Sequence, residues 1–177
     1  MAPPLAFPAL HASHAGIWIA SPDGETRRVG KAEAVARAAE TPMILLNAPL
    51  VAQRLGYAEL SGLDLLELFA FVHPARFVVP TAKGLSELLG LGAPTGDEAV
   101  AGLLVTAAQT LLATLTDAAW PEREGAWDAA QALARLHWPW ARAVAAQLPR
   151  PEQKERWLFS KLPEWEEAPP RTPPRSV

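Results

Sequence analysis

Two histidines lie near the start of the chain, where a short strand is expected to end. His11 and His14 carry imidazole groups, which serve as general bases or as metal ligands when other polar groups support them. The first carboxylate of the chain is Asp23, so no acid precedes this pair. Histidines without a neighbouring carboxylate are more often structural than catalytic, and we expect a structural role here.

Two pairs of acidic residues are the other candidates for metal chemistry. Asp64 and Glu67 are three residues apart and would share a helix face, from which they could chelate a metal ion. No histidine or third acid joins them at a fitting spacing, so a solvated helix face is the expected role. Asp97 and Glu98 open a long helical stretch, where acids ordinarily complement the positive end of the helix dipole. We expect Thr95 to cap that helix.

Tryptophans are concentrated late in the chain, since six of the seven follow residue 119. Around Pro139 they combine with arginines into a patch suited to nucleic-acid or domain contact: Arg135, Trp138, Trp140 and Arg142. Stacking of a base on an aromatic ring contributes about 1–3 kcal/mol. The helix-like intervals between Trp120, Trp127 and Trp138 favour a different role, the filling of a groove against the rest of the protein.

Composition restricts the class of protein. Half of the 177 residues are hydrophobic and 20% are charged, which is typical of a folded chain. No run of about 18 apolar residues predicts a membrane span, and the N-terminus lacks the pattern of a secretory signal. The chain has no cysteine, which excludes disulfides and thiolate zinc sites. We expect a cytoplasmic protein without cofactors and without a membrane partner.

The charge is unevenly distributed. Residues 1–118 hold 7 Lys and Arg against 11 Asp and Glu, a balance of −4, and residues 119–177 hold 9 against 8, a balance of +1. An autonomous nucleic-acid binder needs clustered basic residues for phosphate contacts, and neither part is strongly basic. DNA binding by this chain is therefore expected to be weak.

The order of apolar runs and turn signals predicts an α/β fold. Strands are expected at 9–12, 16–20, 25–29 and 43–46, with a tight turn at 21–24. Helices are expected at 31–39, 50–55, 85–91 (closed by Gly92) and 97–115. Residues 63–72 fit either a helix or a strand that enters a helix. Strands followed by helix, strand and helix predict a mixed sheet covered by helices.

Three parts follow from this organisation. Residues 1–118 form the α/β unit, and residues 119–167 form a Trp-rich helical extension, hereafter the Trp-rich segment. Its helical stretch, 126–148, should be kinked or divided at Pro139. Residues 168–177 read as an extended Pro-rich linker, which indicates a further domain beyond it.

Residues 8–118 resemble the DEDD family of 3′–5′ exonucleases, which have an RNase H-like fold. In that family the first strand ends in Asp-x-Glu before a Thr-Thr-Gly run, and here His11 and Ser13 take the acidic positions ahead of Gly16. The His-Asn-x-x-x-Asp motif corresponds to 46–51, with Asn47 retained and Val51 in place of the acid. The family's pattern of an Asp before an apolar helix and a Pro is similar to residues 62–74, followed by 84–91.

The last family motif, a helix that starts His-x-Ala and carries an Asp one turn later, resembles the stretch from Asp97 to Gly102. Asp97 stands for the histidine and Gly102 for the acid. The family binds two metal ions with four carboxylates, and all four are absent on this alignment. The resemblance therefore implies an RNase H-like domain without the catalytic metal site, because Mg²⁺ requires oxygen ligands.

The arrangement also resembles the N-terminal region of bacterial DinG-type helicases, which are XPD-like and ATP-dependent. The resemblance implies an accessory domain that contacts the helicase domains of its own parent chain or positions DNA during repair or replication. Gly30-Lys31 lacks the rest of a phosphate-binding loop, so this part should not bind ATP.

The principal alternative is an active metal-dependent 3′–5′ exonuclease with displaced ligands. It requires acids to converge within about 4–5 Å of a shared point. The candidates are Asp23, Asp64, Asp97 and Glu98. A third class, an enzyme acting on a small molecule, has no support in the spacing of polar residues.

Overall fold

The fold opens with a three-stranded antiparallel meander. The computed structural model describes residues 6–150, and its first elements are β1 (Ala9–Ser13), β2 (Gly16–Ala20) and β3 (Thr26–Val29). The predicted turn forms at Gly24, whose φ of 97° suits glycine and whose N–H donates to the Ser21 carbonyl. Two cross-strand pairs, His11 with Trp18 and Trp18 with Arg28, align three side chains across the strands.

Two parallel strands complete the sheet on the other side of β1. The chain continues through α1 (Lys31–Glu40), β4 (Ile44–Leu45), α2 (Ala48–Leu55), β5 (Leu63–Asp64) and α3 (Leu65–Val72). The strand order is β3-β2-β1-β4-β5, with β4 parallel to β1 and β5 parallel to β4. This mixed sheet confirms the predicted α/β, RNase H-like arrangement with flanking helices. For residues 63–72, the two predicted alternatives are a helix or a strand that enters a helix. The second is correct, because β5 leads directly into α3.

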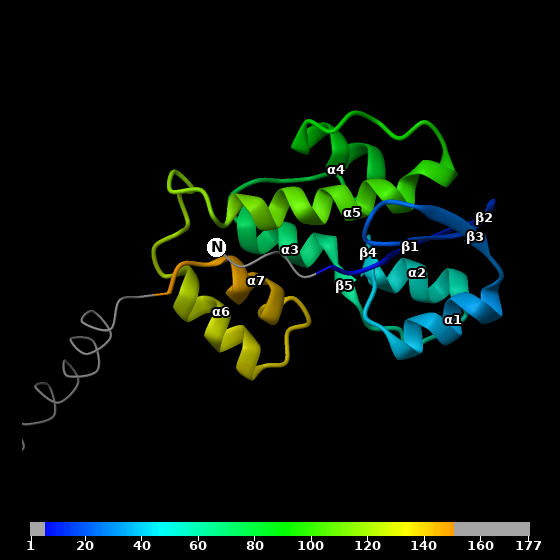
Figure 1. Cartoon of the computed structure of the whole chain (residues 1–177), viewed down its shortest axis with the longest axis horizontal. Coiled ribbons are helices and arrows are strands. Elements are labelled where there is room, and N and C mark those ends of the chain that lie inside the picture. Colours follow the sequence, from blue (N-terminus) through cyan, green and yellow to red (C-terminus); the bar gives the residue numbers. More distant parts are fainter. Residues whose placement is uncertain (1–5, 151–177) are drawn as a thin grey trace, which may run out of the picture.

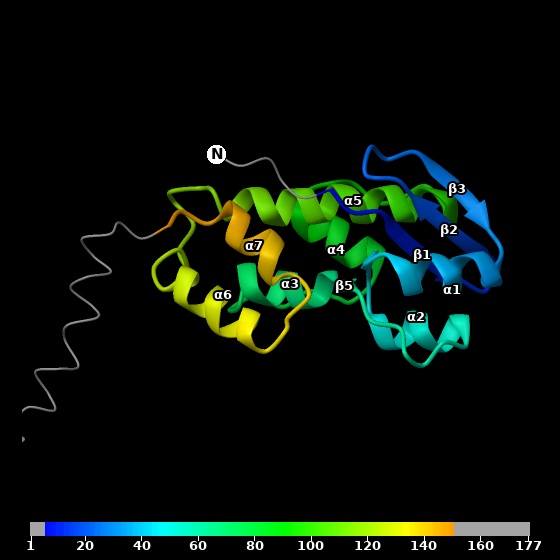
Figure 2. The same ribbon diagram turned by 60° about the horizontal axis from the view of Figure 1, so that its bottom comes forward.

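Helices cover both faces of the sheet (Figure 1, Figure 2). Successive residues of β1 point to opposite faces. Leu10 packs with Ile19 in the cluster that includes apolar residues of α1 and α2, whereas Ala9 and Trp18 belong to the cluster beneath α5 (Asp97–Thr114). The start of α5 therefore lies over the strand that carries the first motif.

The predicted bounds of one helix and the predicted capping residue of another are wrong. Helix α4 spans Ala82–Leu89 rather than 85–91, because the Thr81 hydroxyl caps its first turn and Gly90 ends it with a φ of 72°. Gly92 also has a positive φ, but it lies beyond that end. Thr95 does not cap α5; the capping position belongs to Gly96, which has no side chain, so the helix starts without a side-chain cap.

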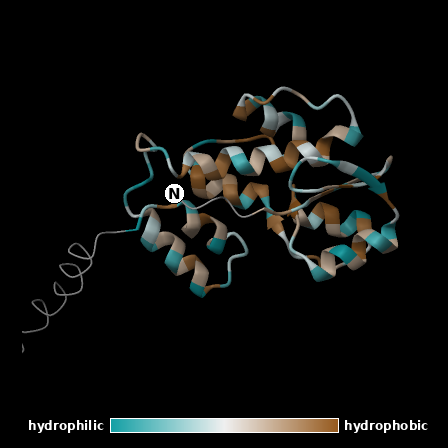
Figure 3. Cartoon of the chain, viewed as in Figure 1, coloured by the Kyte–Doolittle hydropathy of each residue, from teal (hydrophilic) through white to brown (hydrophobic). Residues whose placement is uncertain are grey.

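Up to residue 150, the Trp-rich segment forms two helices, α6 (Ala126–Arg135) and α7 (Ala141–Gln147), and Pro139 lies between them as predicted. They pack beside α3 and α5 rather than around a core of their own (Figure 1). Trp120 and Trp140 are buried in the same apolar cluster as the residues beneath α5, and α3 is apolar along most of its length (Figure 3). The described part of the segment is thus continuous with the main core.

Some predictions lie outside the described residues. They include the end of the Trp-rich segment, at 151–167, and the Pro-rich linker at 168–177. Within residues 6–150, none of the helices combines the length and the apolar character needed to cross a membrane.

Candidate functional site

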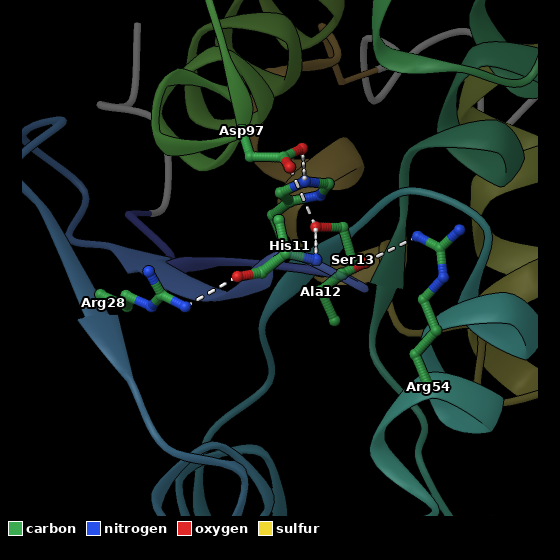
Figure 4. Close-up of polar contacts among 7 residues, drawn as sticks. His11, Ala12, Ser13, Arg28, Arg54 and Asp97 are labelled. Carbon is green, nitrogen blue, oxygen red and sulfur yellow. Dashed lines mark hydrogen bonds and ion pairs between the residues drawn. The ribbon is translucent and has the colours of Figure 1, made fainter.

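His11 and Ser13 of the first motif meet Asp97 of the last motif at the end of β1 (Figure 4). Asp97 Oδ1 lies 3.1 Å from His11 Nε2, and the Ser13 hydroxyl donates to Asp97 Oδ2 at 3.1 Å. His11 and Ser13 are two residues apart on one strand, so both side chains point to the α5 face. Asp97 is the first residue of α5 and faces them across 84 to 86 positions of sequence.

The bond to His11 lowers the pKa of the Asp97 carboxyl from its ordinary value, and the Ser13 bond acts in the same direction. Partial burial opposes this effect. The Ser13 Oγ also accepts the Ala15 N–H at 3.1 Å. Asp97 therefore stays an anion that holds the start of α5 against the end of β1.

This geometry is not that of an activated nucleophile. Such a serine needs a hydrogen bond to a general base, with a third group orienting the base. Here the Ser13 proton is directed to Asp97, and His11 bonds to the other oxygen of the same carboxylate. The three side chains form a clamp between a strand and a helix, with no hydroxyl-to-imidazole contact to pass a proton.

Two arginines fix the main chain on either side of the clamp (Figure 4). Arg54 of α2 donates to the Ala12 carbonyl at 2.8 Å, and Arg28 of β3 donates to the Ala15 carbonyl at 2.7 Å. The Arg28 guanidinium also lies 5.3 Å from the centre of the Trp18 ring, on which His11 stacks. The end of β1 is thus held by cations, whereas the exonucleases that the sequence resembles need acids at this position.

A cavity of about 190 Å³ lies beside the clamp. We call it the β1 cavity; β1, α2, α4 and α5 contribute to its wall, which includes Leu10, Leu46, Val51, Arg54, Val100 and Leu104. His11, of the first motif, and Val51, of the second, therefore both line the β1 cavity. Gly102 does not join them, because a side chain at that position would meet the Gly24 carbonyl and the Thr26 hydroxyl of the β2–β3 turn.

Asn47, the residue retained from the second motif, has a local structural role. Its φ of 67° is in the left-handed region, which asparagine tolerates better than most residues. Its side-chain oxygen accepts the Leu50 N–H at 3.4 Å as the N-cap of α2. The asparagine at this position is explained by the turn into α2 without reference to substrate.

Asp64 occupies the buried junction between α2 and α3, not a solvated face, so that expectation is corrected. Its oxygens accept the N–H groups of Asn47, Ala48 and Leu66 at 3.0, 2.7 and 3.0 Å. Glu67, the other member of the pair, accepts the indole N–H of Trp138 at 3.0 Å. The two acids therefore serve different partners.

The acids proposed as displaced metal ligands are held at separate places. Asp23 bonds to the Ser21 hydroxyl and the Glu25 N–H within the hairpin turn, Asp64 caps α3, and Asp97 belongs to the clamp. No group of three or more His, Asp or Glu side chains that could hold a metal ion occurs among residues 6–150. The condition set by the displaced-ligand hypothesis is not met in the described part of the chain. The donors at the motif positions likewise do not fit a two-metal site for Mg²⁺.

The four residues of the basic-aromatic patch around Pro139 differ in their exposure to solvent. Trp140 is fully buried and its indole N–H donates to the Asp64 carbonyl at 2.8 Å, so it is unable to stack on a base. Trp138 is half-buried against Phe71. Arg135 and Arg142 are exposed. Of the three tryptophans expected to fill a groove, Trp120 is buried in the core, and Trp127 and Trp138 are half-buried against the same apolar cluster.

Two features of this site were missed in the sequence. Arg54 carries no motif, and only the fold brings it to the end of β1. The burial of Asp64 had a weak signal, because the residue lies between two leucines at the boundary of a strand and a helix, where aspartate is a favoured cap.

No protein family model matches this chain, and neither a curated protein nor a solved structure is similar to it.

Proposed function

We propose that this chain is a non-catalytic, exonuclease-like accessory domain of a DinG-type DNA helicase. It acts in the cytoplasm, by contacting protein or by positioning DNA during repair or replication. The observation that supports the proposal most directly is the set of side chains at the end of β1. At the place where related exonucleases have acids, His11 and Ser13 are engaged by Asp97 and Val51 lines an apolar hollow.

Two arguments favour a role without cleavage. Phosphodiester cleavage by this fold requires anionic oxygens that hold two metal ions near the scissile phosphate. Asp97 is the one acid at the site, and both of its oxygens are engaged by side chains. The carboxylate of Asp64, at the end of β5, points into the protein, where its oxygens accept three backbone N–H groups.

Charge favours protein contact over DNA contact. The net charge of −4 over residues 1–118 repels the negatively charged phosphate backbone of DNA. Binding to that backbone depends on clustered Lys and Arg. The role we propose is therefore mainly that of a contact module, with DNA positioning as its weaker component.

A nuclease assay tests the non-catalytic part of the proposal. The full chain is incubated with 3′-labelled single-stranded DNA in Mg²⁺ and in Mn²⁺, and metal uptake is followed by calorimetry. We expect neither shortening of the DNA nor saturable metal binding. Shortening that EDTA abolishes, and that Asp97→Asn or Asp64→Asn also abolishes, would establish an active exonuclease instead.

A helicase assay tests the accessory part. A helicase polypeptide that carries this region is compared with the same polypeptide lacking it, on tailed duplex DNA. We expect removal of the region to slow unwinding several-fold, with little change in DNA-stimulated ATP hydrolysis. Equal unwinding rates, together with no binding of the separate chain to the helicase, would contradict the proposal.

A further inference from the structure

We propose that the β1 cavity is a docking site for a protein partner, which inserts one large apolar side chain into it and places a carboxylate against Arg54. This inference names the contact surface of the accessory domain and rests on the protein-contact part of the proposed function. Four properties of the described residues support it: the size of the cavity, its lining, its rim and its charge.

The size suits a single side chain. A cavity of about 150 Å³ with an apolar lining is large enough for a benzene molecule, and sites for drug-sized ligands begin at about 300 Å³. At about 190 Å³, the β1 cavity lies between these values. It can accept a phenylalanine ring or a branched aliphatic side chain, and it is too small for a nucleotide or an extended cofactor.

The lining is mainly apolar. Nine of the twelve residues around the cavity are aliphatic or proline, and the exceptions are His11, Arg54 and Thr81. All three exceptions already have partners, since His11 bonds to Asp97, Thr81 caps α4 and Arg54 donates to the Ala12 carbonyl. Water in such a space finds few hydrogen-bond partners, so its replacement by an apolar group is favourable.

The rim of the cavity exposes apolar side chains. Of the four large hydrophobic residues that are exposed among residues 6–150, Leu50 at 36% exposure lines the cavity, and Phe77 at 81% and Val79 at 51% precede the lining residue Pro80 in the chain. A group of exposed apolar side chains around a hollow marks an interaction surface.

The charge of Arg54 indicates which polar group the partner places beside the cavity. The described residues contain two ion pairs, His11 with Asp97 and Arg27 with Glu33, so Arg54 is paired with no acid among them. Its bond to the Ala12 carbonyl fixes the guanidinium beside the cavity and uses only part of its five-donor fork. A carboxylate is the protein group that fits this fork best. A DNA phosphate would satisfy Arg54, but it would gain nothing from the apolar rim.

Methyl NMR of the full chain tests the inference with two short peptides. The probes are acetyl-Glu-Phe-Glu-amide and its matched control acetyl-Glu-Ser-Glu-amide. We expect the phenylalanine peptide to shift the methyl signals of Leu46, Val51 and Val100 and to saturate in the millimolar range. The serine peptide should leave these signals unchanged. Absence of a saturable shift with the phenylalanine peptide would overturn the inference.

Paired variants separate the contribution of the cavity to peptide binding from that of the Arg54 charge. Ala82→Leu fills the cavity and should abolish binding, whereas Ala39→Leu adds the same group on the exposed surface of α1 and should not. Arg54→Gln should weaken binding about tenfold, while the exposed Arg142→Gln should not. If Ala82→Leu fails to fold, Leu50→Ser at the rim replaces it, with the same expected loss. Equal affinity in all variants would overturn the inference.

Other occupants have distinct signatures, each of which would overturn the inference. A ten-residue oligo-dT that shifts the same methyl signals at lower concentration than the peptide would identify a DNA site. Peptide affinity that falls as the protein concentration rises would identify a second copy of the chain. A gain in affinity on Trp165→Ala would identify the chain's own C-terminal residues as the occupant.

The inference and the proposed function can fail separately. Slower unwinding on removal of the domain, combined with no peptide binding, would reject only the docking site. Peptide binding combined with metal-dependent cleavage of DNA would reject the non-catalytic function and keep the docking site.

Discussion

Asp64 and Asp97 each stand at the start of a helix, yet their surroundings differ sharply. Asp64 is 5% exposed, and its oxygens accept three backbone N–H groups beneath the Trp-rich segment. The Asp97 side chain is 39% exposed, and it contacts the side chains of His11 and Ser13 beside the β1 cavity. The same residue type thus joins a sealed part of the core at one place and borders an accessible surface at the other.

The apolar residues around the two acids repeat this contrast. On the side of Asp64, the buried indole N–H groups of Trp120 and Trp140 donate to the Val72 and Asp64 carbonyls, and the half-buried Trp138 donates to the exposed Glu67. The polar atoms of these large side chains are satisfied within the protein, which is expected of a packed core. On the side of Asp97, apolar side chains surround a hollow and several face solvent. The comparison indicates that the first region provides stability and that the second is free to bind.

Trp140→Ala should have the largest effect on stability. The ring is fully buried and its N–H bonds to the Asp64 carbonyl at 2.8 Å, so truncation removes both packing and a buried hydrogen bond. We expect the free energy of unfolding to fall by about 3–5 kcal/mol. Urea denaturation followed by circular dichroism measures it. Trp127→Ala, at a half-buried ring, is the control and should cost much less; equal losses would contradict a sealed core at Trp140.

Asp64→Ala should have the next largest effect. It leaves three backbone N–H groups without their acceptor at a buried junction, and we expect a loss of about 2–3 kcal/mol in the free energy of unfolding. Asp64→Asn keeps one acceptor oxygen and should lose about half as much. The same urea titration tests both variants. A loss in Asp64→Ala no greater than that of a surface substitution would show that the junction is not a stabilising cap.

Asp97→Asn should have the smallest effect, and one that depends on pH. Because the fold lowers the pKa of Asp97 below 3.8, the carboxylate stabilises the fold above that value and loses this contribution as the pH falls through the lowered pKa. At pH 7 we expect a loss of at most about 1 kcal/mol, since the pair is partly exposed. The difference between variant and parent should shrink towards pH 2.

Urea midpoints at pH 7 and pH 2 measure this effect. Glu98→Gln is the matched control, because it removes an acid from the same helical turn without removing a contact to His11 or Ser13. A pH dependence that is identical in the two variants would assign the effect to the helix dipole rather than to the clamp.

Local signals in the sequence were sufficient for most of the elements. The Pro22-Asp23-Gly24 run predicts the hairpin turn, Pro139 predicts the division between α6 and α7, and the apolar run at 43–46 predicts a buried strand. Each of these depends on the conformational preferences of a few adjacent residues, which the chain carries with it. The two errors, in the bounds of α4 and in the capping residue of α5, arose where several turn-forming residues compete within one short stretch.

The site depended on contacts that no local pattern encodes. His11 and Asp97 are 86 residues apart, and the pairing of β1 with β4 and the placement of α5 bring them together with Arg54 and Val51 beside one cavity. Burial of Asp64 and Trp140 likewise results from the packing of α7 beside α5, which brings Trp140 against the Asp64 carbonyl. The sequence by itself determined which segments become strands, helices and turns, because those preferences are local. Only the tertiary structure decided which side chains meet and which become inaccessible to solvent, because these depend on the packing of distant segments.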